Sequence, residues 1–263
     1  MCVIVLFFRV HPQLPLVVAA NRDEYYARAS SGPLLLNESP RVVGGRDLER
    51  GGTWMGFAEG GLFVGLTNQR TVMPRPPEPA RRSRGEVVTG ALRAASIGGV
   101  EQLLASTDAR AYNPYNLLFG DARQLRVAYA REGDPTVRVH PLEAGLYVLD
   151  NDTLGTTMPK VMRAEALARP LAARPWFELF PALHAMLADH AMPEPAQVPA
   201  PPAWMDPEIA RRLQSLCVHT PAYGTRSATI AAVGVDGVMH YRFAPGPPCQ
   251  TSFIDATSLL ATS

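Results

Sequence analysis

The second residue, Cys2, is the first candidate for a chemical role, because removal of Met1 would leave it with both a thiol and a free α-amine. A free thiol has a pKa of about 8.5 and an α-amine has one of about 7.7–8.0, so a nucleophile and a base would share one residue. This combination is the basis of N-terminal-nucleophile catalysis, in which the amine accepts the proton of the attacking group.

A charged tetrapeptide, Asn21-Arg22-Asp23-Glu24, follows the second apolar run of the chain. The apolar runs 3–8 and 16–20 are rich in β-branched and aromatic residues, and the turn-forming segment 11–15 separates them, which predicts an antiparallel hairpin. Such a hairpin brings the tetrapeptide close to Cys2. Arg22 would then lower the thiol pKa, and Asp23 would hold the α-amine or the arginine. The alternative is an ion-pair cluster that merely ends a strand.

Two asparagines and a late arginine complete the set of candidate catalytic residues. Asn68 and Asn151 each end a predicted strand, where a side-chain amide can donate to an oxyanion. One such donor contributes about 2.7–4 kcal/mol in a working hydrolase. The alternative is that each amide only satisfies buried backbone groups. Arg226 offers fixed positive charge to a thiolate or to a substrate carboxylate.

Residues for ligand binding are less sharply marked. The segment 72–82 is rich in proline and arginine, and its arginines, with Arg84, could contact an anionic ligand, although such runs are usually solvated loops. An apolar ligand would suit the aromatic and aliphatic residues near the motifs, which are Tyr25, Tyr26, Trp54, Met55 and Phe57.

Composition excludes several classes of function. The chain has 263 residues, a formal net charge of +1 and 47% hydrophobic residues, so we expect neither nucleic-acid binding nor binding to a membrane surface. No run approaches the ~18 consecutive apolar residues of a membrane span, so stable membrane insertion is not expected. A length of this size is compatible with a single domain over residues 1–263.

The cysteines and histidines do not predict a metal site. The three cysteines have no regular spacing, which argues against a disulfide scaffold or a zinc knuckle and favours a reducing, cytoplasmic location. We predict that Cys217 is a core thiol and that Cys249 is exposed and without a role. The six histidines are scattered, and none is predicted as a metal or haem ligand.

The order of predicted elements is strands, helices, strands, helices and strands, which is an α+β pattern. The segment 25–40 lacks periodicity and is predicted as a loop. Ser83 and Glu86 have the spacing of a capping box before the first helix. Three short strands, at 125–129, 136–140 and 146–149, predict an antiparallel meander.

Several motifs, in this order, resemble the NRDE family, which is also called the transport-and-Golgi-organisation-2 family. The resemblance extends from Met1 to about Tyr241 and rests on Met1-Cys2, Asn21-Arg22-Asp23-Glu24, Gly51-Gly52-Thr53-Trp54-Met55-Gly56, Leu66-Thr67-Asn68, Ser83-Arg84-Gly85-Glu86 and Tyr223-Gly224-Thr225-Arg226. It implies the N-terminal-nucleophile hydrolase fold and a link to haem trafficking or to acyl-CoA and lipid metabolism. Within the matched motifs, Asn21, Glu24, Trp54 and Arg84 are candidate ligand-binding residues. Pattern and resemblance together predict a four-layer αββα sandwich of two antiparallel sheets.

The same residues are similar to the cysteine subgroup of that fold, which includes choloylglycine hydrolases and penicillin V acylases. That subgroup has an N-terminal cysteine, an Arg-Asn-x-Asp stretch, an asparagine closing each of two strands and a late arginine. This chain departs from it in the spacing and order of Asn21-Arg22-Asp23. The resemblance implies catalytic roles for Cys2, Arg22, Asp23, Asn68, Asn151 and Arg226.

Three functions remain open at this stage. The first is a cysteine amidohydrolase that cuts an amide or related acyl bond of a small amphiphilic molecule and needs no cofactor for catalysis. The second is a carrier that holds haem or a fatty acyl-CoA as cargo in the same cleft. The third is a scaffold protein with neither activity.

Overall fold

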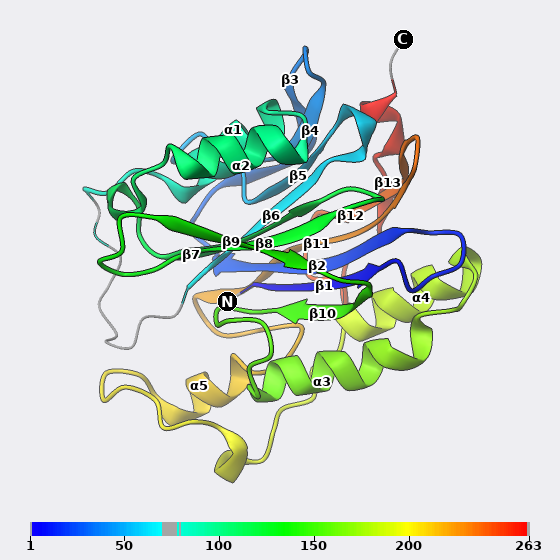
Figure 1. Ribbon diagram of the computed structural model, residues 1–263. Coiled ribbons are helices and arrows are strands. Elements are labelled where there is room, and N and C mark those ends of the chain that lie inside the picture. The colour runs from blue at the N-terminus through cyan, green and yellow to red at the C-terminus, as the bar shows by residue number, and fades with distance from the viewer. Residues whose placement is uncertain (1, 70–77, 79, 262–263) are drawn as a thin grey trace.

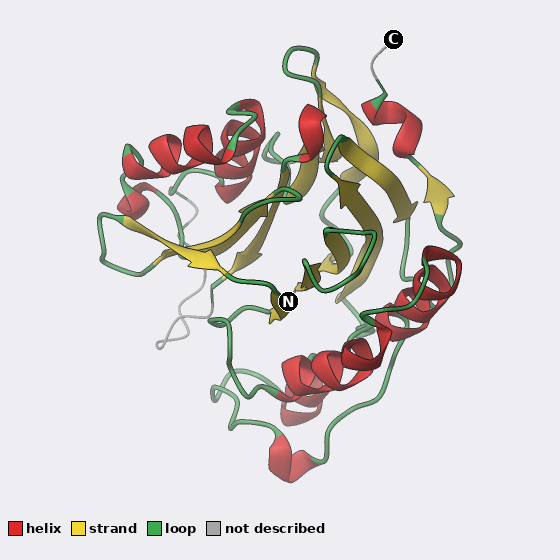
Figure 2. Cartoon of the chain, turned by 45° about the vertical axis from the view of Figure 1, so that its right-hand side comes forward, coloured by secondary structure: helices red, strands yellow, loops and turns green. Residues whose placement is uncertain are grey.

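The computed structural model describes residues 2–69, 78 and 80–261 of the chain. Two antiparallel sheets pack face to face, and helices cover the outer face of each sheet (Figures 1 and 2). Three clusters of buried apolar side chains lie between the four layers. The predicted αββα sandwich is therefore confirmed.

The first sheet carries the amino-terminal hairpin, and its strand order is β10-β1-β2-β11-β12-β13. Its strands are β1 (Val3–Phe8), β2 (Leu16–Tyr25), β10 (Gly145–Leu149), β11 (Tyr223–Gly234), β12 (Gly237–Ala244) and β13 (Ile254–Asp255). The predicted meander is wrong at its last strand, because β10 leaves the second sheet and pairs with β1. This crossing brings the end of β10 beside the start of the chain.

The second sheet has the strand order β3-β4-β5-β6-β7-β8-β9. Its strands are β3 (Ser30–Asn37), β4 (Val42–Asp47), β5 (Met55–Ala58), β6 (Phe63–Asn68), β7 (Tyr115–Gly120), β8 (Leu125–Ala130) and β9 (Val137–Leu142). The prediction of a loop over 25–40 is wrong, because β3 lies within it. This strand is at an edge, is only half-buried, and pairs with β4 in a register that shifts twice, so no alternation marks it in the sequence.

Helices α1 (Arg84–Arg93) and α2 (Ile97–Ala105) cover the second sheet, and α3 (Pro159–Ala168) and α4 (Trp176–Leu187) cover the first (Figure 1). A shorter helix, α5 (Pro207–Arg212), precedes β11. The predicted capping box is wrong: the Ser83 side chain makes no capping bond, and Glu86 pairs with Arg82 at 2.8 Å instead. Within the described residues, no helix has the length and apolarity needed to cross a membrane.

The alternation of side chains along β1 and β2 fixes which residues can reach the space between the sheets. In β1, Val3, Val5 and Phe7 pack toward α3 and α4, whereas the intervening residues pack toward the second sheet. The same alternation in β2 continues into the tetrapeptide. Asn21 and Asp23 therefore face the helices, and Arg22 and Glu24 face the inter-sheet side.

Candidate active site

Cys2 directly precedes β1, between the two strands that flank β1 in its sheet. When the antiparallel register is continued to Cys2, the residues level with it are Arg22 on β2 and Asn151 just after β10. Two segments that are far apart in the sequence therefore meet beside the thiol because of strand pairing alone.

A cleft of about 390 Å³ opens beside Cys2. It is lined by eight of the ten residues that the sequence marks as catalytic or ligand-binding, namely Cys2, Arg22, Asp23, Glu24, Trp54, Asn68, Arg84 and Arg226. Residues from both sheets and from the start of α1 thus share one site. Asn21 and Asn151 are not among the lining residues.

Asn21 is fully buried on the helix-facing side of β2. Its Nδ2 donates hydrogen bonds to the backbone carbonyls of Leu187 and Leu216, at 2.8 Å and 2.9 Å. These bonds join β2 to the end of α4 and to the segment before β11. The geometry gives Asn21 a structural role and no contact with a ligand in the cleft, contrary to the prediction.

Asn151 supports another candidate residue. Its Nδ2 donates to the backbone carbonyl of Asn68 at 2.5 Å, across the gap between the two sheets. This contact matches the alternative in which Asn151 satisfies a backbone group. The side chain of Asn68 itself is exposed at the cleft, so it is the asparagine that can donate to an oxyanion there.

Asp23 borders the cleft, but its carboxylate binds residues of the helix-facing side. Its Oδ2 forms an ion pair with Lys160 Nζ of α3 at 3.1 Å, and its Oδ1 accepts a hydrogen bond from the Thr225 hydroxyl at 2.7 Å. The side chains of Lys160 and Asp23 are 1% and 0% exposed. Sequence reasoning did not give Lys160 a role, although it is the only lysine in an arginine-rich chain, and that was the available signal.

The thiol of Cys2 is half-buried and donates a weak hydrogen bond to the backbone carbonyl of Asp23, at 3.8 Å. Burial raises the pKa of the Cys2 thiol above its ordinary value, and the charge of Asp23 adds to this effect. The guanidinium of Arg22 acts in the opposite direction, as predicted, but desolvation outweighs it. Met1, whose removal would free the α-amine of Cys2, lies outside the described residues.

Arginines outnumber acidic residues in the cleft lining by eight to five. Arg84 is the most unusual of them, because burial, followed by the charge of Arg28, lowers its pKa to about 10. Its recorded partner is a neutral one, the backbone carbonyl of Pro114 at 3.2 Å. Within the described residues Arg84 forms no ion pair. A bound anion would therefore offset the free-energy cost of burying its charge.

The other arginines of the predicted basic loop are occupied or not described. Arg81 pairs with Glu78 and Glu132, and Arg82 pairs with Glu86. Residues 70–77 and 79, which hold Arg75, lie outside the described residues. Arg84 is therefore the member of that set best placed to meet an anion.

Arg226 reaches the cleft because β11 contains a bulge. The pairing of β11 with β2 shifts between Thr225 and Ser227, which leaves Arg226 as the extra residue. A bulge breaks the alternation of side chains and redirects one of them. The guanidinium of Arg226 donates to the backbone carbonyl of Tyr26 at 2.5 Å and lies over the Tyr26 ring.

Two glycines join two of the recognised motifs at the cleft. A Cβ on Gly52 would lie 2.5 Å from the backbone of Gly85, and Thr53 N donates to the Gly85 carbonyl at 3.4 Å. Only glycine permits this approach of one backbone to another. The contact sets the start of α1, and with it Arg84, against the segment that carries Trp54, just before β5.

Searches of solved structures find the same architecture in two enzymes. The C2A mutant of conjugated bile acid hydrolase from Clostridium perfringens superposes with a TM-score of 0.59, covering 100% of this chain and 95% of that one, at 11% identity. Penicillin V acylase from Agrobacterium tumefaciens gives a TM-score of 0.57, covering 98% and 86%, at 13% identity. At these identities the likeness shows the N-terminal-nucleophile hydrolase-like fold and nothing about the reaction.

Sequence comparison identifies the family. The human Transport and Golgi organization protein 2 homolog is 31% identical over 257 residues, with 90% of each chain covered. The Drosophila melanogaster protein Transport and Golgi organization protein 2 is 28% identical over 268 residues, covering 92% of this chain and 90% of the relative. The family model for Transport and Golgi organisation 2 matches residues 1–243. The chain belongs to the Transport and Golgi organisation 2 family.

Proposed function

We propose that the protein hydrolyses an amide or related acyl bond of a small amphiphilic molecule that carries an anionic group, with Cys2 as the nucleophile. One observation carries the proposal: Cys2 and the desolvated Arg84 line the same cleft. A nucleophile that shares a cleft with an unpaired cation suits an acyl compound whose anionic group lies near the scissile bond.

The apolar part of the ligand would contact the remaining lining. Trp54, Met55, Leu66 and Phe243 contribute aromatic and aliphatic surface to the cleft. Small-molecule sites are typically apolar clefts with a few polar groups that fix orientation. Phe57, which the sequence also offered for this role, is instead fully buried between the sheets.

The reaction follows from the groups at Cys2 once Met1 is removed. The α-amine takes the thiol proton and the sulfur attacks the acyl carbon, so that a C–S bond forms. The C–N bond of the substrate then breaks, and the leaving amine takes the proton from the α-amine of Cys2. Water adds to the thioester, the C–S bond breaks, the carboxylic acid departs and the thiol regains its proton. The Asn68 amide stabilises the oxyanion formed in each step.

N-palmitoylglycine and its methyl ester test this proposal, because they differ only in the anionic group beside the amide. We expect release of glycine from the acid by the wild-type protein, much slower cleavage of the ester, and no turnover by Cys2→Ala at an unchanged melting temperature. Intact mass should show that Met1 is absent. Equal turnover by Cys2→Ala, or a retained Met1 in an active protein, would remove this mechanism.

A second candidate is a carrier of haem or a fatty acyl-CoA in the same cleft. It is favoured by the surroundings of the thiol, since burial raises the pKa of Cys2 and both carboxylate oxygens of Asp23 are bound by Lys160 and Thr225. Haem would give a Soret band on titration, and palmitoyl-CoA would give a calorimetric binding isotherm. Saturable binding of either ligand without turnover would favour the carrier, and no binding of either would exclude it.

A further inference from the structure

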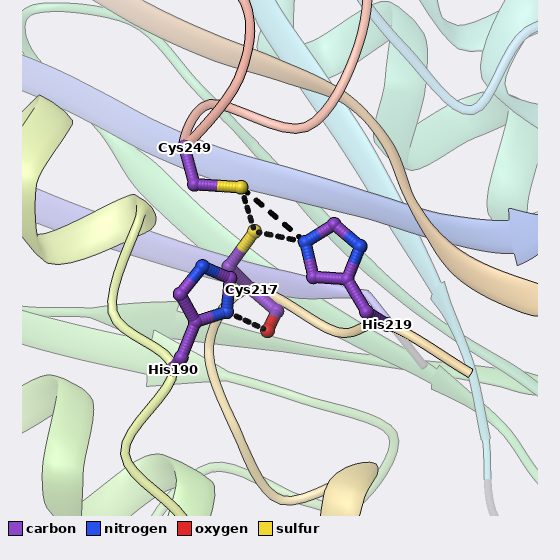
Figure 3. Close-up of side chains that lie close together, drawn as sticks. All are labelled: His190, Cys217, His219 and Cys249. Carbon is purple, nitrogen blue, oxygen red and sulfur yellow. Dashed lines mark hydrogen bonds between the residues drawn. The ribbon is translucent and has the colours of Figure 1, made fainter.

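Four potential metal ligands converge at a second place in the molecule, away from the cleft lining. They are His190, Cys217, His219 and Cys249 (Figure 3). They come from three segments: the start of the loop after α4, the segment before β11 and the loop after β12. The prediction that histidines and cysteines are scattered and unrelated is therefore wrong for these four.

The distances among the side chains suit a single ion. Cys217 Sγ lies 3.6 Å from Cys249 Sγ and 3.7 Å from His219 Nε2, and His219 Nε2 lies 3.3 Å from Cys249 Sγ. One ligand atom from each of the four residues lies within 4.8 Å of all the others. Tetrahedral zinc, with bonds of about 2.3 Å to sulfur and 2.0–2.1 Å to nitrogen, requires ligand atoms about 3.3–3.8 Å apart.

His190 is already oriented for coordination. Its Nδ1 lies 3.1 Å from the backbone carbonyl of Cys217, and because a carbonyl can only accept, Nδ1 carries the hydrogen (Figure 3). The lone pair is then on Nε2. Histidine ligands of metals typically use one nitrogen for the metal and donate with the other to a carbonyl or carboxylate.

We propose that these four residues bind one Zn²⁺ ion in a closed Cys₂His₂ site. Two thiolates and two imidazoles in tetrahedral arrangement are the preferred donor set of structural zinc, and such sites leave no position open for a substrate. Binding releases the two thiol protons to solvent.

The ion would stabilise the segment that packs against the helix-facing side of β2. Val218, next to Cys217, donates its backbone N–H to the Thr225 hydroxyl at 2.9 Å, and that hydroxyl donates to Asp23. On the other side of Cys217, the backbone carbonyl of Leu216 accepts a hydrogen bond from Asn21 Nδ2. Zinc would thus fix the segment that holds both Asn21 and Asp23, without entering the cleft.

The test is metal content of the full-length protein, purified in reductant and without metal-chelating resin, then titrated with Zn²⁺. We expect one zinc per chain by plasma mass spectrometry, and at least a tenfold loss of bound zinc in Cys249→Ser and in His219→Ala. Cys2→Ala and His140→Ala are matched controls that should keep the metal, since neither residue belongs to the cluster. Co²⁺ should give the absorption of tetrahedral cobalt with thiolate charge transfer.

Three results would overturn the proposal. The first is a protein that binds no zinc after titration. The second is equal loss of zinc in Cys2→Ala, which would place the ion at the amino terminus. The third is a Cys217–Cys249 disulfide in protein kept in reductant. Cys249 lies at the surface, so its variant is expected to fold, and His219→Ala gives an independent readout at the same site.

Discussion

The two faces of the tetrapeptide at the end of β2 differ in what their side chains do. On the helix-facing side, Asn21 donates to two backbone carbonyls, and Asp23 binds a buried lysine and a threonine hydroxyl. On the inter-sheet side, Arg22 and Glu24 line the cleft beside Cys2. One motif therefore holds the fold with alternate residues and forms the site with the others, because successive side chains of a strand point to opposite faces.

The largest effect should come from breaking the buried ion pair on the helix-facing side. Lys160→Met leaves the Asp23 carboxylate buried without this partner, and we expect the free energy of unfolding to fall by about 3–5 kcal/mol in urea denaturation. Arg169→Met, directly after the same helix, removes an exposed pair with Glu165 and should cost about 0–1 kcal/mol. Similar losses in the two variants would contradict the structural assignment of Asp23.

The glycine contact at the cleft should give the next effect. Gly52→Ala forces a Cβ into the backbone of Gly85, and we expect a loss of about 1–3 kcal/mol together with weaker ligand binding. Gly98→Ala is the control, since a Cβ there meets nothing within 4 Å. Thermal denaturation and ligand titration measure both variants. A Gly52→Ala protein with unchanged stability and ligand affinity would show that the contact of Gly52 with Gly85 does not shape the cleft.

Asn21→Ala should destabilise the protein without changing the cleft. It leaves the carbonyls of Leu187 and Leu216 without their amide donor, which costs about 1–3 kcal/mol. Urea denaturation measures this loss, and ligand affinity should be unchanged. A variant of full stability with impaired ligand binding would return Asn21 to the ligand-binding residues.

We expect Arg22→Ala to have the smallest effect on stability. Its specific effect should be on the reactivity of the Cys2 thiol. Because burial raises the pKa of the Cys2 thiol, alkylation of Cys2 by iodoacetamide should become fast only above the ordinary pKa of cysteine. Loss of the Arg22 charge disfavours the thiolate, so the midpoint of the pH profile should move higher still. Peptide mass spectrometry follows the rate at Cys2. A midpoint at or below that of a free cysteine would contradict the role given to burial.

Much of the site was predictable because it depends on local pattern and order along the chain. The hairpin of β1 and β2 follows from two apolar runs and a turn, and it alone brings Arg22 beside Cys2. The face that each residue of the tetrapeptide presents also follows from alternation, but only once it is known which face of the sheet the helices cover. That information is tertiary, so the matched motif alone does not separate Asn21 from the residues that reach the cleft.

The features that escaped prediction depend on long-range pairing. Three of them produce no periodic pattern in the sequence: the pairing of β10 with the first sheet, the bulge at Arg226 and the ion pair of Lys160 with Asp23. The convergence of His190, Cys217, His219 and Cys249 has the same cause, because only two of the four residues are close in sequence. Irregular spacing of cysteines and histidines excludes a local zinc motif but not a site assembled by the fold.

The central claim is that Cys2 attacks an acyl compound whose anionic group, near the scissile bond, lies against Arg84. The esters 3-octanoyloxybenzoate and neutral phenyl octanoate test it directly, because they share the acyl group and differ in a carboxylate beside the ester, and peptide mass spectrometry locates the acyl adduct. We expect an adduct on Cys2 that forms at least tenfold faster from octanoyloxybenzoate in the wild-type protein than in Arg84→Ala, with no such difference for phenyl octanoate. An adduct on Cys249 alone, or rates from the two esters that respond equally to Arg84→Ala, would contradict it.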